Sequence, residues 1–364
     1  MINNEFVATF EEQYPVNIDK LLEIAYKDSA SDLHLTVAMP PMARIKGELI
    51  PLDFPTLSTK NVEELIMPIV QTEYKKHFEE NLELDISYAV PGIARFRGNI
   101  MKQKGTLAAV FRIIPFEVPE INTLGLPVTI RDLCSLSRGL VLVTGPTGSG
   151  KSTTLAAMID LINSERRVNI VTIEDPIEFI HKHKNSVVKQ REVGLDTHSF
   201  ANALRHVLRH DPDVILVGEM RDVESIAIAL TAAETGHLVL STLHTQTASH
   251  TINRIVDVFQ DYRREQVRQQ LANTLRAVIS QQLIPTVDES GRVMAVEIMR
   301  DTMAIRNMIR EGKEHQLYSV IQTSRSMGMQ TMDQALAELY SKGKINKETA
   351  IEYCTDKLEL ERII

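Results

Sequence analysis

The 364-residue sequence contains no tryptophan, only two cysteines and no long apolar run. Cys134 and Cys354 offer neither a disulfide framework nor a C-x2-C zinc site, so we expect no zinc and a reducing compartment. No apolar stretch reaches the roughly 18 residues that cross a bilayer. Acidic Glu5, Glu11 and Glu12 stand where a secretory signal needs a basic start. These absences favour a cytoplasmic protein.

An excess of positive charge is missing as well. The chain has 40 Lys and Arg residues against 48 Asp and Glu residues, which gives a net charge of −8 at pH 7. No basic stripe is interleaved with aromatic residues, so we expect no nucleic-acid partner. Hydrophobic residues make up 43% of the chain, enough for a sizeable core. At about 150 residues per domain, the length predicts two domains.

The expected boundary between these domains lies in a segment rich in proline. Pro115, Pro119 and Pro127 punctuate it, and we predict a linker at residues 115–122. Residues 1–114 then form a small α+β domain, since helical spacing at Ile18, Leu21, Leu22 and Ala25 is followed by short strands and hairpins. The runs Asp32–Val37 and Arg44–Leu49 are expected to pair, as are Ala94–Ile100 and Leu107–Ile114.

Residues 123–364 follow a different pattern, that of an α/β fold. Apolar runs at 140–143, 168–173, 214–217 and 238–241 alternate with helical patterns at 151–163, 199–209 and 223–235. Such alternation predicts a parallel sheet that is buried on both faces. From about residue 262 onward we expect mostly helix, with one strand-like run that begins at Arg292.

A phosphate-binding motif opens the second domain. The run from Gly145 to Ser152 fits G-x-x-x-x-G-K-S/T and lies between an expected strand and an expected helix. Its backbone N–H groups and its lysine suit the phosphates of ATP, and the serine hydroxyl suits Mg²⁺. The predicted nucleotide-binding residues are Gly145, Pro146, Thr147, Gly148, Ser149, Gly150, Lys151, Ser152 and Thr153.

Acidic residues follow two of the expected strands. The run ending at Glu219 delivers an acid beside the phosphate loop, and we expect Glu219 to activate the attacking water. Glu174, Asp175 and Glu178 follow the preceding strand, and at least one of them is expected to organise the metal's water shell. The metal candidates are Ser152, Glu174 and Glu219. The alternative is that these acids only cap the following helices.

Histidines and arginines supply further candidates. His237 opens a strand that leads to His244, where a γ-phosphate sensor is possible, although a lone histidine is more often a core or surface residue. Arg95, Arg97 and Arg112 lie on the N-terminal hairpin and form either a basic patch near the nucleotide or a solvated sheet face. The second domain has its own candidates for arginine-assisted phosphoryl transfer in Arg205, Arg209 and Arg221.

Four ordered segments together resemble the Walker A motif, Asp box, Walker B motif and His box of secretion ATPases. They are Gly145–Ser152, Thr172–Glu178, Val214–Asp222 and Thr235–His244. Ser31–Leu35 and Ala304–Gly312 narrow the resemblance to the PilT-type retraction ATPases of type IV pili, over essentially the whole chain. One departure is His210, which precedes Asp-Pro-Asp where the family has Gln or Glu.

This resemblance implies an N-terminal PAS-like domain, a RecA-like ATPase domain and a homo-hexameric ring that couples ATP hydrolysis to pilus disassembly and twitching motility. It implies that Glu219 is the catalytic glutamate and that Arg95, Arg97 and Arg112 approach the nucleotide from the N-terminal domain. The resemblance also implies a role in retraction for the segment from Ala304 to Gly312. The expected location is the cytoplasmic base of the pilus machine, where an inner-membrane platform protein is the partner and supplies the contact with the membrane.

Other functions fit parts of the pattern. A PilU-like accessory ATPase and a pilus-assembly or type II secretion ATPase share the four boxes, although the usual assembly ATPase carries a tetracysteine zinc site that this chain lacks. A RecA-like nucleic-acid motor shares the phosphate loop, but the net charge argues against it. A nucleotide-gated scaffold without hydrolysis is the remaining alternative.

Overall fold

The computed structural model describes residues 14–114, 118–288 and 291–364, and the acidic N-terminal residues discussed above lie outside them. Contacts divide the chain into two compact units, residues 1–116 and 117–364. Residues 115–117 of the predicted linker also lie outside the described residues, and Ile121–Leu124 forms a 3-10 turn. Ile121 is buried in a core of the larger unit. The predicted domain boundaries stay a prediction.

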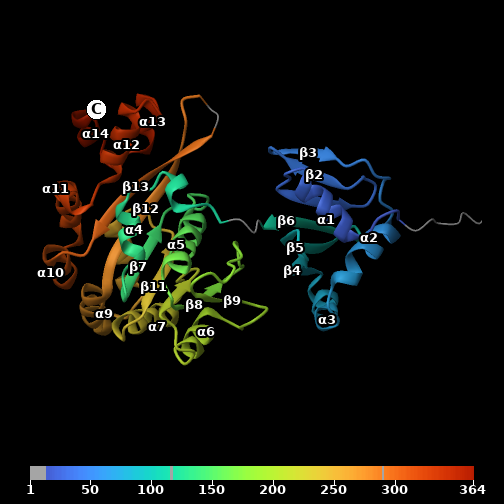
Figure 1. Cartoon of the computed structure of the whole chain (residues 1–364), viewed down its shortest axis with the longest axis horizontal. Coiled ribbons are helices and arrows are strands. Elements are labelled where there is room, and N and C mark those ends of the chain that lie inside the picture. The colour runs from blue at the N-terminus through green and yellow to red at the C-terminus, as the bar shows by residue number, and fades with distance from the viewer. Residues whose placement is uncertain (1–13, 115–117, 289–290) are drawn as a thin grey trace, which may run out of the picture. The chain divides into compact units, whose positions relative to one another are not determined.

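The smaller unit is an antiparallel sheet with helices (Figure 1). Its strand order is β3-β2-β1-β6-β5-β4, and the elements are α1 (Ile18–Lys27), β1 (Asp32–Thr36), β2 (Met42–Ile45), β3 (Glu48–Pro51), α2 (Thr59–Ile66), α3 (Thr72–Asn81), β4 (Glu83–Val90), β5 (Ala94–Gln103) and β6 (Thr106–Ile114). This confirms the α+β pattern and the pairing of β5 with β6. The PAS-like assignment stays a prediction.

Helix α1 shows why these elements form where they do. Asn17 caps it by accepting a hydrogen bond from the Lys20 N–H, and its apolar residues recur at helical spacing. Ile18, Leu21, Leu22 and Ala25 are therefore buried together in the core of the unit. The segment expected to form one partner strand, Arg44–Leu49, instead contains the turn between β2 and β3, with Lys46 and Gly47 at positive φ.

The larger unit is built on a seven-stranded sheet in the order β13-β12-β7-β11-β10-β8-β9. Its strands are β7 (Gly139–Thr144), β8 (Asn169–Glu174), β9 (Val187–Glu192), β10 (Val214–Val217), β11 (Leu238–Leu243), β12 (Leu275–Pro285) and β13 (Arg292–Arg300). All neighbours pair in parallel except β12 and β13, which are antiparallel. The predicted α/β class and parallel sheet are confirmed.

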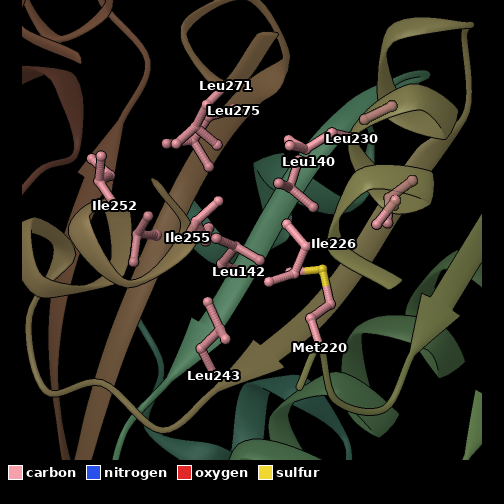
Figure 2. Packing of buried hydrophobic residues seen from close by; sticks show 14 of the residues in the cluster. Leu140, Leu142, Met220, Ile226, Leu230, Leu243, Ile252, Ile255, Leu271 and Leu275 are labelled. Atoms are coloured by element: carbon pink, nitrogen blue, oxygen red, sulfur yellow. The ribbon is translucent and has the colours of Figure 1, made fainter. Parts of the chain in front are cut away.

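Helices pack on both faces of this sheet. The helices of this unit are α4 (Thr129–Cys134), α5 (Lys151–Glu165), α6 (Phe200–Val207), α7 (Val223–Glu234), α8 (Ala248–Asp257), α9 (Asp261–Thr274), α10 (Met303–Glu311), α11 (Leu317–Thr323), α12 (Met332–Ser341), α13 (Lys347–Tyr353) and α14 (Lys357–Ile363). Helices α4 and α5 share a core with one face, and α6 to α11 share a core with the other. Figure 2 shows side chains of β7, α7 and α8 meeting in this second core.

The last helices form a separate cluster. Figure 1 shows α12, α13 and α14 grouped together near the β12–β13 hairpin, and Ile284 and Ala295 of that hairpin are buried against them. Among the described residues, none of the helices has the length and apolar character needed to cross a membrane.

Two strands of the larger unit escaped the sequence pattern. The chain after residue 262 was expected to be helical up to Arg292, yet β12 is the longest strand of the sheet, from Leu275 to Pro285. Polar Ser280, Gln281 and Gln282 interrupt its apolar run, although the first two are fully buried. Strand β9 was also missed because it lies at the sheet edge, where Lys189, Gln190 and Arg191 are compatible with a strand.

We predict that Gly98→Ala destabilises the smaller unit. A Cβ at Gly98 would lie 2.8 Å from Ile86 Cγ1 and 2.8 Å from Phe111 Cε1, inside a packed core. Overpacking of this kind lowers the free energy of unfolding by about 1–3 kcal/mol. Urea denaturation followed by circular dichroism measures the change. Gly291→Ala is the control, because no atom of the described residues lies within 4 Å of its added Cβ. Equal midpoints for the two variants would contradict the prediction.

Candidate nucleotide-binding site

A cavity of about 600 Å³ lies at the carboxyl ends of the central parallel strands in the larger unit. The loops that follow β7, β8, β10 and β11 contribute its walls, together with residues of β12 and β13. Ligands of open α/β sheets bind at this edge, because successive strand ends and helix N-termini face the same crevice. The cavity therefore has the position expected of a nucleotide site.

The phosphate loop adopts a backbone that requires glycine. Gly145 has φ +144°, and a Cβ there would lie 2.3 Å from the Gln281 carbonyl oxygen and 2.6 Å from Ser149 Oγ. Gly150, at φ +86°, precedes α5, and no side chain of the described residues caps that helix. The first N–H groups of α5 are thus left for a ligand, and the helix N-terminus favours an anion. The buried Ser149 hydroxyl has no partner among the described residues.

Lys151 is held inside the loop. Its Nζ donates to the Gly145 carbonyl oxygen at 3.0 Å and to that of Pro146 at 2.9 Å, and the residue is 8% exposed. Burial lowers the pKa of Lys151, and the acidic Glu219 and Glu178 oppose that change. Of the predicted nucleotide-binding residues, those lining the cavity are Thr147, Gly148, Gly150, Lys151, Ser152 and Thr153. The loop therefore fits a nucleotide's phosphates.

Glu219 lies between two basic side chains. Its Oε1 is 3.2 Å from His244 Nε2 and its Oε2 is 2.8 Å from Arg221 Nε. All three residues line the cavity. His244 follows β11 and Glu219 follows β10, so the parallel pairing of these strands brings the two boxes together. This arrangement leaves a partly buried carboxylate, 20% exposed, with a nitrogen of a basic side chain beside each of its oxygens.

The acids at the end of β8 and just after it line the same cavity, and Glu174, the last residue of β8, is the most buried of them. Its Oε1 accepts hydrogen bonds from Thr172 Oγ1 at 2.6 Å and Gln190 Nε2 at 3.1 Å. Burial raises the pKa of Glu174, while these two donors oppose the rise. Asp175 and Glu178 also line the cavity.

The predicted metal candidates, Ser152, Glu174 and Glu219, all line this cavity. Within the described part of the chain, no group of three or more His, Cys, Asp or Glu residues could hold a metal ion. A cation that keeps its waters and binds substrate phosphates suits such a site better than one that needs a full protein cage. Mg²⁺ has this preference, and a serine hydroxyl and carboxylates are the oxygen donors it accepts.

Some predicted residues lie elsewhere. His237 is at the amino end of β11, where its Nδ1 is 2.9 Å from the Ala232 carbonyl oxygen, and it does not line the cavity. Arg205 forms an ion pair with Glu224.

Arg95, Arg97 and Arg112 belong to the smaller unit, where Arg97 and Arg112 are direct cross-strand partners. Each arginine contacts a neighbour in its own unit: Ser87 for Arg95, Asp85 for Arg97 at 4.0 Å and Asp32 for Arg112 at 3.0 Å.

The sequence did not predict the side chains that hydrogen-bond to the backbone of the phosphate loop and of the segment before Glu219. Gln281 of β12 is fully buried, and its Nε2 donates to the Ser149 carbonyl oxygen at 2.7 Å. Thr242 Oγ1 donates to the Gly218 carbonyl oxygen at 2.6 Å, which holds the segment before Glu219. Polar residues inside an apolar strand are the one sequence feature that marks such supporting side chains. In β12 the same polar residues broke the apolar pattern, so the strand was not predicted.

We predict that Gln281→Ala weakens ADP binding about tenfold, because the buried carbonyl of Ser149 loses its donor and the phosphate loop loses its support. Isothermal titration calorimetry with ADP measures the effect. Gln282→Ala is the matched control, since Gln282 is the next residue of β12 and its side chain faces the other side of the sheet. An unchanged ADP affinity in Gln281→Ala would show that the loop holds its shape alone.

Comparison with known proteins gives a consistent result. The family model described as type II/IV secretion system protein matches residues 11–335. The type IV pilus retraction ATPase PilT of Pseudomonas aeruginosa is 52% identical over 337 residues, covering 93% of this chain and 98% of that protein. A twitching motility protein of Neisseria gonorrhoeae is 50% identical over 85% of this chain and 83% of its own length.

A solved structure is similar over nearly the whole chain. The crystal structure of the pilus retraction motor PilT with bound ADP superposes with a TM-score of 0.90 at 50% identity, covering 95% of this chain and 99% of that one. A bound adenine nucleotide in that structure agrees with the phosphate-loop chemistry described above.

Proposed function

Because this chain belongs to the type II/IV secretion system protein family, we propose that it is the motor ATPase that powers retraction of type IV pili. The chain is an ATPase by its family and by its site. The observation that carries the retraction function is the identity of 52% to a retraction ATPase over 337 residues, which cover 98% of that protein's length.

The phosphate loop and Lys151 bind the triphosphate. Backbone N–H groups from Gly148 to Thr153 surround phosphate oxygens, and the Lys151 ammonium exchanges its two carbonyl partners for them. The low exposure of Lys151 strengthens its attraction for phosphate, since little water screens the charge. Ser152, Glu174 and Glu219 are the residues that would hold Mg²⁺, which supplies charge neutralisation at the phosphates when bound.

Glu219 orients and deprotonates the attacking water. Arg221 and His244 contact its two oxygens, so the carboxylate is fixed in one orientation toward the cavity. A positioned general base contributes about 10²- to 10⁴-fold to such a reaction. Glu174, Asp175 and Glu178, at and just after the end of the neighbouring strand β8, add negative charge to the cavity and would arrange water around Mg²⁺. His244 is placed to report changes at Glu219 to the segment that follows β11.

Assembly and partners belong to the same proposal. We place the motor as a homo-hexamer at the cytoplasmic base of the pilus machine, beside an inner-membrane platform protein. Arg95, Arg97 and Arg112 supply positive charge toward the nucleotide, as phosphoryl transfer often uses an arginine from another domain or subunit. Rigid-body shifts between units convert hydrolysis into motion. Electron microscopy of the purified protein with ATP tests the hexameric ring directly.

We predict that Glu219→Gln keeps ADP affinity within about twofold of wild type and lowers ATP turnover at least 100-fold, because an amide accepts no proton. Calorimetry and phosphate release measure the two effects. In cells of the source organism, this variant assembles pili that do not retract. Normal turnover in Glu219→Gln would assign water activation to another acid. Pilus retraction in cells that lack this protein would refute the cellular function.

We predict that Lys151→Ala abolishes measurable ADP binding, since the phosphate charge loses its buried partner. The effect is expected to exceed about 100-fold in affinity, because truncating one member of a desolvated charge pair costs several kcal/mol. Calorimetry measures it, with Lys184→Ala as the control, because Lys184 pairs with Asp160 outside the cavity. Equal affinity in Lys151→Ala and wild type would overturn the assignment of the loop.

A further inference from the structure

Glu297 is a carboxylate buried in the larger unit, and its hydrogen-bond partners among the described residues are backbone groups. It lies in β13, is 2% exposed, and faces Ser280 of β12 in the antiparallel register. Ser280 in turn faces Thr144, the last residue of β7 before the phosphate loop, and Thr144 Oγ1 donates to Ser280 Oγ at 2.9 Å. Thr144, Ser280 and Glu297 thus form one buried polar row across three strands, at the level where the loop begins.

Two helices begin at Glu297. The Ala248 N–H, the first of α8, donates to Glu297 Oε1 at 2.8 Å, and the backbone of Met332, the first residue of α12, also hydrogen-bonds to this carboxylate. A carboxylate between two helix N-termini interacts favourably with both dipoles. Burial nevertheless raises the pKa of Glu297 to about 7, with the negative charge of Asp333 adding to the rise.

The helix caps leave these two N–H groups to Glu297. Thr247 accepts from the His250 N–H at 3.2 Å and Thr331 accepts from the Gln334 N–H at 3.2 Å, so each threonine satisfies the third N–H of its helix. The first N–H of each helix needs another acceptor, because no intrahelical carbonyl reaches it. Glu297 supplies that acceptor to both.

Helix α8 connects Glu297 with the hydrolytic site. Only residues 244–247 separate the end of β11 from α8, and His244 at their start contacts Glu219. Thr245 Oγ1 lies 2.6 Å from Thr251 Oγ1, which ties this short segment to the first turns of α8. A shift of the α8 N-terminus therefore displaces His244 relative to Glu219.

Helix α12 is fixed to the same strand. Gln330 exchanges two backbone hydrogen bonds with Ile298, at 2.9 and 3.2 Å, and its Nε2 donates to the Val296 carbonyl oxygen at 2.8 Å. The start of α12 is thus held beside Glu297, because Gln330 bonds to both chain neighbours of Glu297, Val296 and Ile298. The C-terminal helices and the His244 segment share one buried anchor.

We propose that Glu297 is a positioning residue for ATP hydrolysis: it holds the α8 N-terminus, and through it His244 against Glu219, in a frame shared with the start of α12. The proposal rests on the proposed function, in which Glu219 activates water. Glu297 does not touch the nucleotide cavity. Its loss therefore changes the rate of the chemical step and leaves nucleotide binding intact.

The test compares three variants of the full chain in the same assays. Glu297→Gln keeps the side-chain shape but replaces one of the two carboxylate oxygens with an NH₂ group, which cannot accept a hydrogen bond from a helix N–H, and it removes the negative charge. We expect kcat per folded protein to fall about tenfold, as small misplacements of catalytic groups do, with ADP affinity within about twofold of wild type. Glu219→Gln, measured in parallel, reports separately on the proposed function.

Glu314→Gln is the matched control. Glu314 is also a buried carboxylate of this unit, 4% exposed, but its partner is the Arg268 side chain. We expect this variant to lower the melting temperature without lowering kcat. Unchanged kcat in Glu297→Gln, or an equal loss in Glu314→Gln, overturns the positioning role; normal turnover in Glu219→Gln overturns the proposed function instead.

A measurement on the wild-type chain covers the case in which Glu297→Gln does not fold. One anchor for two helix starts predicts that the amides of Ala248 and Met332 open together, so their hydrogen-exchange rates, corrected for intrinsic rates, agree within about tenfold. Mass spectrometry with fragmentation resolves both amides. Rates that differ by more than about a hundredfold would show that the two helix starts are independent and would overturn the shared anchor.

Discussion

The close approach of the phosphate loop to β12 is the constraint on which the larger unit depends. The Gly145 backbone meets the Gln281 carbonyl so closely that no side chain fits between them. This contact requires β7 to lie directly beside β12, and the parallel register of these strands provides it. The same neighbours align Thr144 with Ser280, so the strand end, the loop and their support form one rigid layer beneath the nucleotide cavity.

The charged side chains of the cavity are neutralised by contacts with one another more than by contact with water. Lys151 is buried, and the negative charges of Glu219 and Glu178 favour its charged form. Glu219 in turn contacts Arg221 and His244. A nucleotide therefore enters a site whose charges are already partly paired, and its phosphates compete with carbonyl and carboxylate oxygens for the cations. Such competition links the occupancy of the site to the positions of the loops after β10 and β11, and a motor needs a link of this kind between nucleotide state and conformation.

Much of this architecture follows from the sequence. Local features predicted the phosphate loop, the strands that deliver Glu174 and Glu219, and the helices between them, because each depends on spacing within a short segment. The supporting residues did not follow, because their roles depend on contacts across more than a hundred residues, as between Gln281 and Ser149. His237 and His244 illustrate the same limit: only the direction of β11 separates the one that reaches the cavity from the one that does not.

The sheet of the smaller unit has a consequence for the order in which the protein forms. Strand β1 pairs with β6, from Asp32 opposite Arg112 to Thr36 opposite Ala108, so the centre of that sheet joins its first and last strands. During synthesis, the edge of β1 that pairs with β6 stays unpaired until β6 has left the ribosome. The sheet therefore closes only when β6 inserts between β1 and β5, and a chain interrupted before residue 106 exposes an open strand edge to other chains.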